Sequence, residues 1–165
     1  MKIRAVTSQE FWIRWAIMAD LPECAQIEQA CFDFPMDEKA LGHYFRERNL
    51  ITVVAGIGQK SPHNKQKIVC FMVYETQKSR VRIKSIATHP KYQRQGFGRK
   101  MIEALVIKLK KLNYQEIIAE VREADLDTQV FLREMGFKGF QNRPEYCEYR
   151  KTNYVFVYTI HKNSA

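Results

Sequence analysis

The pattern of apolar and polar positions along the chain predicts seven β-strands. They are expected over residues 12–17, 50–55, 68–75, 81–88, 116–122, 137–140 and 154–160. The third and fourth of these strands flank the polar segment Gln77-Lys78-Ser79, and we expect them to form a hairpin.

Apolar residues at helical spacing predict four helices between these strands. Asp20 is expected to cap the first helix, with Pro22 in the first turn and Glu23 placed to complete a capping box. Asp37 is expected to cap the second helix. The third helix follows two glycines at positions 96 and 98, and the fourth spans 126–135 and is closed by Gly136. The predicted apolar faces contain Cys24, Ile27 and Cys31 in the first helix, Leu41, Tyr44 and Phe45 in the second, and Met101, Leu105, Leu109 and Leu112 in the third.

The elements follow the order β-α-α-β-β-β-α-β-α-β-β, which predicts an α+β (mixed α/β) layered fold. A chain of 165 residues with 45% hydrophobic and 27% charged residues is expected to form one globular domain. We place this domain at 12–165, after an N-terminal extension at 1–11.

Composition excludes several other classes of protein. The apolar runs are too short for a membrane span, and the first ten residues lack the apolar segment of a signal peptide, so a cytoplasmic protein is expected. The four cysteines (Cys24, Cys31, Cys70 and Cys147) form no Cys-x-x-Cys pair or zinc-binding pattern, so we expect reduced thiols and no metal site. The net charge of +9 favours polyanions in general, but the basic residues are dispersed, so sequence-specific nucleic-acid binding is not expected.

The segment from His89 to Arg99 carries the clearest chemical signal. It joins an alternating strand to a helix through Gln93-Arg94-Gln95-Gly96-Phe97-Gly98. The N–H groups at the start of a helix have no partner within the helix, so such a turn can bind phosphate. The pattern is not a Walker loop, and Met101 replaces the third glycine of the dinucleotide fingerprint. The alternative interpretation of the two glycines is a tight turn or a helix cap.

The Gln-x-x-Gly-x-Gly pattern and the element order together resemble the GNAT acetyltransferases. Within that family, the chain resembles the branch of bacterial ribosomal-protein alanine N-acetyltransferases. The segments that carry this resemblance are Ile13-Arg14, Asp20-Leu21, Ile27-Glu28-Gln29-Ala30, Phe34-Pro35, Glu120-Val121-Arg122 and Phe131–Phe137. The resemblance implies a central, mostly antiparallel, twisted sheet of about seven strands with about four helices.

The same resemblance implies a site for acetyl-CoA without a metal. Backbone groups of Ile86, Ala87 and Thr88 would bind pantetheine and the acetyl group. Backbone N–H groups of the loop would bind the pyrophosphate. The loop residues concerned are Gln93, Arg94, Gln95, Gly96, Phe97, Gly98 and Arg99. Asp125 stands where the branch has an asparagine beside the cofactor.

The resemblance also gives Glu120 the role of general base. A carboxylate in the apolar strand 116–122 is costly to bury, which would raise its pKa toward a useful value; the alternative is a glutamate in an ion pair, for instance with Arg122 or Lys84. Leu132 replaces the tyrosine that protonates the departing thiolate in the branch, so either the thiolate leaves unprotonated or another donor serves. Tyr146 is the candidate donor, and a packing role is the alternative.

The expected reaction is transfer of an acetyl group to a primary amine. We expect the acceptor to be the α-amine of a protein N-terminus, such as that of a ribosomal protein, and the enzyme to be a monomer or weak homodimer. The segments that face the acceptor in the branch diverge at Met36 and Thr152-Asn153. Three alternatives therefore stay open: acetylation of a small amine or lysine side chain, a CoA-sensing module without turnover, and a basic RNA- or ribosome-binding module.

Overall fold

The computed structural model describes residues 10–58, 66–141 and 153–161, and all seven predicted strands lie in one sheet. The strands are β1 (Phe11–Trp15), β2 (Leu50–Ile57), β3 (Lys67–Thr76), β4 (Arg80–Thr88), β5 (Glu116–Arg122), β6 (Lys138–Gln141) and β7 (Asn153–Thr159). The helices are α1 (Leu21–Cys31), α2 (Glu38–Arg46), α3 (Phe97–Lys111) and α4 (Leu126–Glu134), with 3₁₀ turns η1 (Met18–Asp20) and η2 (Pro90–Tyr92). The predicted element order and the α+β class are thus confirmed.

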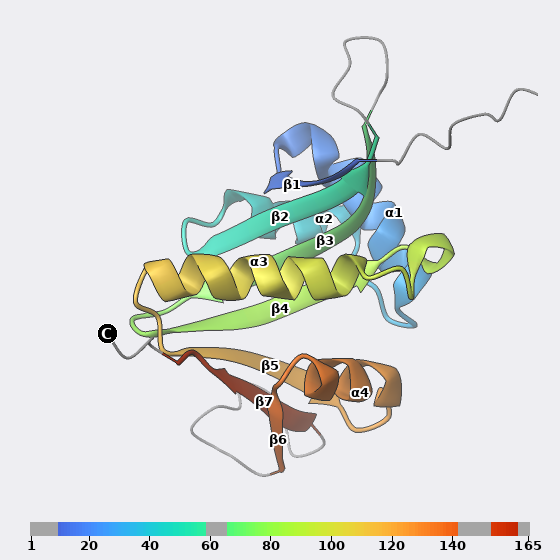
Figure 1. Cartoon of the computed structure of the whole chain (residues 1–165). Coiled ribbons are helices and arrows are strands. Elements are labelled where there is room, and N and C mark those ends of the chain that lie inside the picture. The colour runs from blue at the N-terminus through green and yellow to red at the C-terminus, as the bar shows by residue number, and fades with distance from the viewer. Residues whose placement is uncertain (1–9, 59–65, 142–152, 162–165) are drawn as a thin grey trace, which may run out of the picture.

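The sheet has the strand order β1-β2-β3-β4-β5-β7-β6 and is mostly antiparallel, as predicted. Among the described strands, only β4 and β5 pair in parallel, because α3 connects them as a crossover. Helices α1 and α2 cover one face of the sheet, and α3 and α4 lie on the other (Figure 1). The sheet is therefore the middle layer of three.

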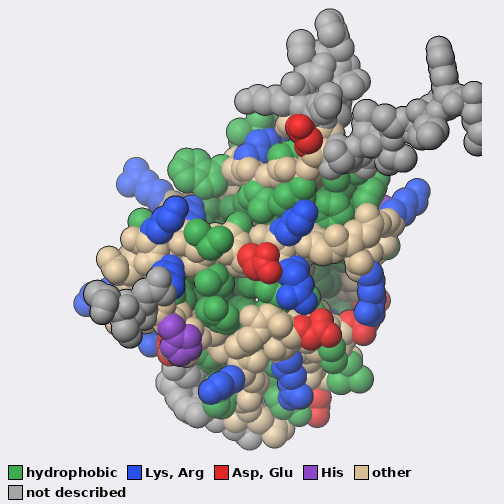
Figure 2. Space-filling model, in the orientation of Figure 1, with side chains coloured by type: hydrophobic (Ala, Val, Ile, Leu, Met, Phe, Trp, Pro, Cys, Tyr) green, Lys and Arg blue, Asp and Glu red, His purple; other side chains and the backbone are tan. Residues whose placement is uncertain are grey.

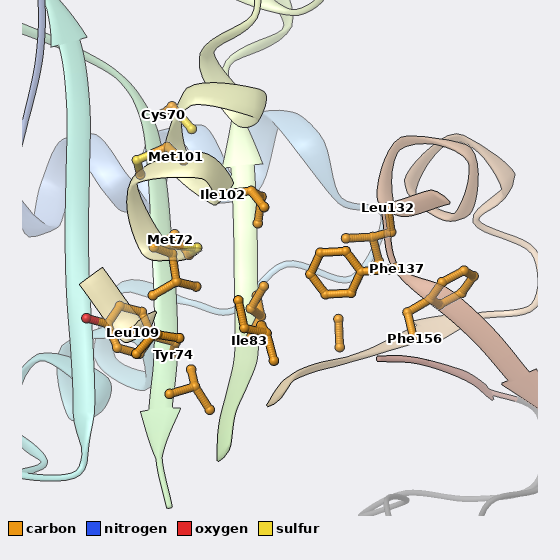
Figure 3. Packing of buried hydrophobic residues seen from close by; sticks show 14 of the residues in the cluster. Cys70, Met72, Tyr74, Ile83, Met101, Ile102, Leu109, Leu132, Phe137 and Phe156 are labelled. Atoms are coloured by element: carbon orange, nitrogen blue, oxygen red, sulfur yellow. The ribbon is translucent and has the colours of Figure 1, made fainter. Parts of the chain in front are cut away.

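The larger part of the core lies between the sheet and helices α3 and α4 (Figure 3). The α3 residues Met101, Leu105 and Leu109 are buried there, as their spacing predicted. The prediction for Leu112 was wrong: α3 ends at Lys111, so Leu112 follows the helix and is 57% exposed. Ile102 fills the apolar face instead.

The start of α1 also differs from the prediction. Strand β1 ends at Trp15, and η1 occupies the residues before α1. The carboxylate of Asp20 makes no cap on α1; it accepts hydrogen bonds from the Arg14 guanidinium at 2.6 and 2.9 Å and from the Ile17 N–H at 2.8 Å. Glu23 accepts from the Ile68 N–H of β3 at 3.3 Å, away from the predicted capping box. The Asp20 carboxylate thus binds the residues before the helix, and the Glu23 carboxylate binds the sheet, instead of both capping α1.

Other local predictions are confirmed. The Asp37 carboxylate accepts a hydrogen bond from the Ala40 N–H at 2.7 Å and caps α2. Gly136 follows Met135, the C-cap of α4, and adopts φ 92°, as expected for a closing glycine. Residues 1–9 of the predicted extension, together with Tyr146, Cys147 and Thr152, lie outside the described residues.

Strands β4 and β5 separate halfway along their length. They pair only from Arg80 to Ile83 on β4 and from Glu116 to Ala119 on β5. The register between β3 and β4 shifts at the same place, because Lys84 is an extra residue between the paired positions Ile83 and Ser85. Such a bulge bends a strand. The second half of β4 therefore leaves one of its edges unpaired with β5.

Candidate active site

The unpaired edge of β4 presents backbone polar groups at two positions. The His89 N–H donates to the Val69 carbonyl of β3 at 2.8 Å. Because successive backbone groups of a strand point to opposite edges, the N–H and C=O groups of Ile86 and Thr88 point away from β3. The backbone of Ala87 points toward β3, so the geometry favours Ile86 and Thr88 as the groups that meet a ligand.

The Thr88 carbonyl already has two partners within the protein. It accepts from the Gln93 side-chain amide at 3.0 Å and from the Cys31 thiol at 3.2 Å. Gln93 thus folds back from the loop onto the end of β4 and ties the two segments together. This leaves the Thr88 N–H and the backbone groups of Ile86 for a ligand.

The loop that follows ends in a left-handed turn at the start of α3. Gly96 has φ 86°, and Arg94 also has a positive φ of 61°. A Cβ at Gly96 would meet no atom within 4 Å, so the backbone conformation is what requires glycine there. At Gly98 the reason is packing, because a Cβ would lie 3.2 Å from the Phe131 ring. Both glycines therefore have structural reasons that are compatible with binding phosphate.

The N-terminus of α3 is open and positively charged. No side chain in the described part of the chain caps it, and the first hydrogen bond within the helix runs from the Lys100 N–H to the Gly96 carbonyl. The side chains of Arg94, Gln95 and Arg99 are exposed around it. Phe97 differs, because its ring is buried against Phe11, so only its backbone can serve a ligand. Unpaired N–H groups, the helix dipole and nearby guanidinium groups together favour an anion here.

Glu120 lies on β5 just beyond the point where the two strands separate. Its side chain leaves the strand on the face opposite Ala119 and Val121, which belong to the core under α3 and α4. Its carboxylate accepts a hydrogen bond from the Arg82 guanidinium at 2.7 Å, and the two side chains are only 12% and 8% exposed. Glu120 is therefore in an ion pair, which the sequence analysis kept as the alternative, although its partner is Arg82. Sequence reasoning considered Arg122 and Lys84 as ion-pair partners and missed Arg82, since only the parallel register of β4 and β5 brings Arg82 beside Glu120.

A second buried carboxylate lies close to the same segment of β4. Glu28 of α1 is 4% exposed and accepts from the Met36 N–H and the Ser85 hydroxyl, each at 3.2 Å. Burial raises the pKa of Glu28, although both hydrogen bonds act in the opposite direction. Sequence reasoning had noted Glu28 only as part of the family pattern. Its position between Cys24 and Ile27 on one side and Cys31 on the other was the signal that it would face the interior.

Asp125 and Leu132, which the sequence analysis also singled out, have roles in the fold itself. The Asp125 carboxylate accepts from the Thr128 N–H at 3.1 Å and caps α4. Leu132 is 1% exposed and packs in the core near Phe137 (Figure 3). Tyr146 lies outside the described residues. Among the residues that the structure describes, no group of His, Cys, Asp and Glu could hold a metal ion, and no helix is long and apolar enough to cross a membrane.

The cysteines that the structure describes (Cys24, Cys31 and Cys70) are free thiols, as predicted. Burial raises the pKa of Cys24 and of Cys70 to about 12. A thiol with so high a pKa stays protonated at neutral pH and is a poor nucleophile. These two residues therefore act as small apolar core side chains.

Comparisons with known proteins agree with the sequence resemblance. The model of the acetyltransferase (GNAT) family matches residues 13–137. The [ribosomal protein bS18]-alanine N-acetyltransferase of Escherichia coli K12 is 29% identical over 127 residues, which are 77% of this chain and 80% of that protein. The enzyme of the same name from Salmonella typhimurium LT2 is 26% identical over the same shares of the two chains.

Solved structures show the same fold. The crystal structure of the ribosomal-protein-S18-alanine N-acetyltransferase from Escherichia coli superposes with a TM-score of 0.75 at 22% identity, covering 94% of this chain and 97% of the other. Ard1 from Thermoplasma volcanium gives 0.76 at 18% identity, with coverage of 92% and 99%. The structure of yncA from Salmonella typhimurium with its cofactor acetyl-CoA gives 0.68 at 15% identity, with coverage of 94% and 96%.

Proposed function

The chain belongs to the acetyltransferase (GNAT) family, and we propose on this premise that it transfers an acetyl group from acetyl-CoA to the N-terminal α-amine of a protein, such as a ribosomal protein. The family supports the general activity of an acetyl-CoA-dependent N-acetyltransferase. The choice of acceptor is supported by the enzymes that acetylate an alanine of ribosomal protein bS18, of which one is 29% identical to this chain.

One observation carries the proposal for the acetyl donor: the unpaired edge of β4 leads directly into the uncapped N-terminus of α3. An extended pantetheine arm can add to the strand through Ile86 and Thr88. The diphosphate can then bind the N–H groups of the turn at 94–99, where the helix dipole and the Arg94 and Arg99 side chains favour negative charge. The residues that we propose for the acetyl-CoA site are Ile86 and Thr88 of β4 with Ala87 between them, and Gln93, Arg94, Gln95, Gly96, Phe97, Gly98 and Arg99 of the loop, with Asp125 as a neighbour.

Glu120 is the group that we propose as general base for the acceptor. Its carboxylate lies on the strand that diverges from the donor-binding edge, and the ion pair with Arg82 fixes its direction. An α-amine titrates near 7.7–8.0 and a lysine side chain near 10.4, so about 2.5 pKa units favour an N-terminal acceptor.

The buried Leu132 cannot donate a proton to the departing thiolate. With an ordinary thiol pKa near 8.5, the thiolate can leave unprotonated.

The experiment that tests the acceptor is thiol release from acetyl-CoA with matched peptides. Four acceptors are compared: a peptide with a free N-terminus, the same peptide with a blocked N-terminus, a lysine peptide with a blocked N-terminus, and a polyamine. Mass spectrometry then locates the acetyl group. We expect transfer only to the free N-terminus. Transfer to polyamine or lysine instead would overturn the proposed acceptor and leave the family assignment intact.

Two substitutions separate donor binding from transfer. Glu120→Gln should lower kcat by at least about a hundredfold, as expected when a general base is lost, with acetyl-CoA affinity unchanged. Gly96→Val should weaken acetyl-CoA binding, since a β-branched residue cannot easily adopt φ 86° at the turn. Circular dichroism of both variants checks that the fold is intact. An unchanged rate in the first variant, or normal affinity in the folded second variant, would refute the corresponding role.

A further inference from the structure

A hollow on the α3 face of the sheet lies apart from the proposed active site. Helix α3 packs mainly on β3 and β4 and contacts β1 through a few side chains such as Phe97, so it covers the neighbouring strands β1 and β2 only in part on this face. The hollow between them has a volume of about 270 Å³. Its apolar wall is formed by Ile13, Val53, Met72, Met101, Ala104 and Leu105. Figure 2 shows hydrophobic side chains exposed over the strands beside α3.

One positive charge at this hollow has no acidic partner among the described residues. The Lys108 ammonium lies 3.1 Å from the Tyr74 hydroxyl and 5.1 Å from the centroid of the Trp15 ring. Within the described part of the chain, no carboxylate lies within 4 Å of it. Arg14 also lines the hollow, but its guanidinium is paired with Asp20 at 2.6 Å. Lys108 is therefore the cation that remains for a ligand.

Tyr74 provides a second donor beside this charge. Its side chain is buried, and its hydroxyl oxygen accepts from the Lys108 ammonium. No acceptor for the Tyr74 O–H lies among the described residues, so this proton can point into the hollow. An ammonium and a hydroxyl donor side by side match the two oxygens of a carboxylate.

We propose that this hollow binds a small monocarboxylate with an apolar body. The apolar wall excludes water from the body of the ligand, and the Lys108 and Tyr74 donors bind its carboxylate. The volume lies just below the usual range of about 300–1,000 Å³ for drug-sized ligands, which favours a smaller molecule. The positive charge of Lys108 disfavours a cationic ligand. A neutral ligand binds more weakly because it cannot form the charge-assisted hydrogen bond with Lys108.

Octanoate is the probe for this site, used below the concentrations at which it forms micelles and without acetyl-CoA. Isothermal titration calorimetry measures its affinity, and the fluorescence of Trp15 at the hollow gives a local signal. We expect saturable binding of octanoate, and binding of 1-octanol and octylamine that is weaker by roughly tenfold or more. Equal affinity for octanoate and 1-octanol would overturn the carboxylate assignment.

Three variants locate the binding. Lys108→Met should weaken octanoate binding by roughly tenfold or more, whereas Lys111→Met removes the same charge from an exposed position of the same helix and should leave the affinity unchanged. Ala104→Phe places a ring in the hollow and should abolish binding. Wild-type affinity in the Lys108 or Ala104 variants, each checked for folding by circular dichroism, would refute the site.

Discussion

The Arg82–Glu120 ion pair gives the sharpest test of how the candidate site is built. Replacing Arg82 with methionine removes the guanidinium but keeps a long apolar side chain in the same space. The Glu120 carboxylate then loses a hydrogen bond of 2.7 Å at a position where its side chain is only 12% exposed. The expected result is a large loss of stability together with a loss of acetyl transfer, because the same contact orients the proposed base.

The size of the stability loss follows from burial. Exposed ion pairs contribute about 0–1 kcal/mol, whereas removing one partner of a buried pair costs about 3–5 kcal/mol. With side-chain exposures of 8% and 12%, the Arg82–Glu120 pair belongs to the buried class. A free energy of this size corresponds to a decrease in Tm of roughly 6–20 °C for a domain of this length.

Urea denaturation of a double-mutant cycle measures the effect. The cycle contains the wild type, Arg82→Met, Glu120→Gln and the double variant, with Arg133→Met as a control that removes the same charge from an exposed position on α4. We expect the control to cost under about 0.5 kcal/mol and the cycle to give a coupling of at least about 1 kcal/mol. A cost for Arg82→Met that equals the control, or a coupling near zero, would refute the reasoning.

Three further predictions concern single positions. Because burial raises the pKa of Glu28 above its ordinary 4.5, its carboxyl group binds more protons in the folded than in the unfolded state just above that pH, so the contribution of Glu28 to stability should fall as the pH rises through this window. Glu28→Gln should lack this fall, and denaturation curves at pH 4 and pH 7 would contradict us if the difference between the two proteins stayed constant. Asp37→Ala should lower the free energy of unfolding by about 0.5–2 kcal/mol through loss of the α2 cap, whereas Asp37→Asn should retain most of it; equal losses would exclude capping as the cause. Gly56→Ala should destabilise the fold more than either, since its Cβ would lie 2.0 Å from the Lys67 carbonyl oxygen, and a Tm within about 2 °C of the wild type would show that β2 can shift.

The sequence determined the features that depend on neighbouring residues. The strand at 116–122, the cap at Asp37 and the closing glycine at position 136 are predicted correctly because each depends on side chains a few residues apart. The Gly-x-Gly turn before α3 could be predicted from the sequence for the same reason. Strand and helix limits differed by one or two residues from those predicted, as at β1 and at the end of α3.

Tertiary structure decided which distant groups meet. Asp20 and Glu23 are residue types typical of a helix start, yet neither caps α1. The Asp20 carboxylate accepts a hydrogen bond from Arg14, and the Glu23 carboxylate accepts one from the Ile68 N–H. Arg82 and Glu120 come together only through the parallel register of β4 and β5. The Glu23–Ile68 and Arg82–Glu120 contacts join residues 45 and 38 positions apart, and their existence depends on strand register and on which helix covers which face of the sheet. The sequence therefore determined the family and the location of the donor loop, whereas the partners of the proposed base and the hollow at Lys108 arose from packing alone.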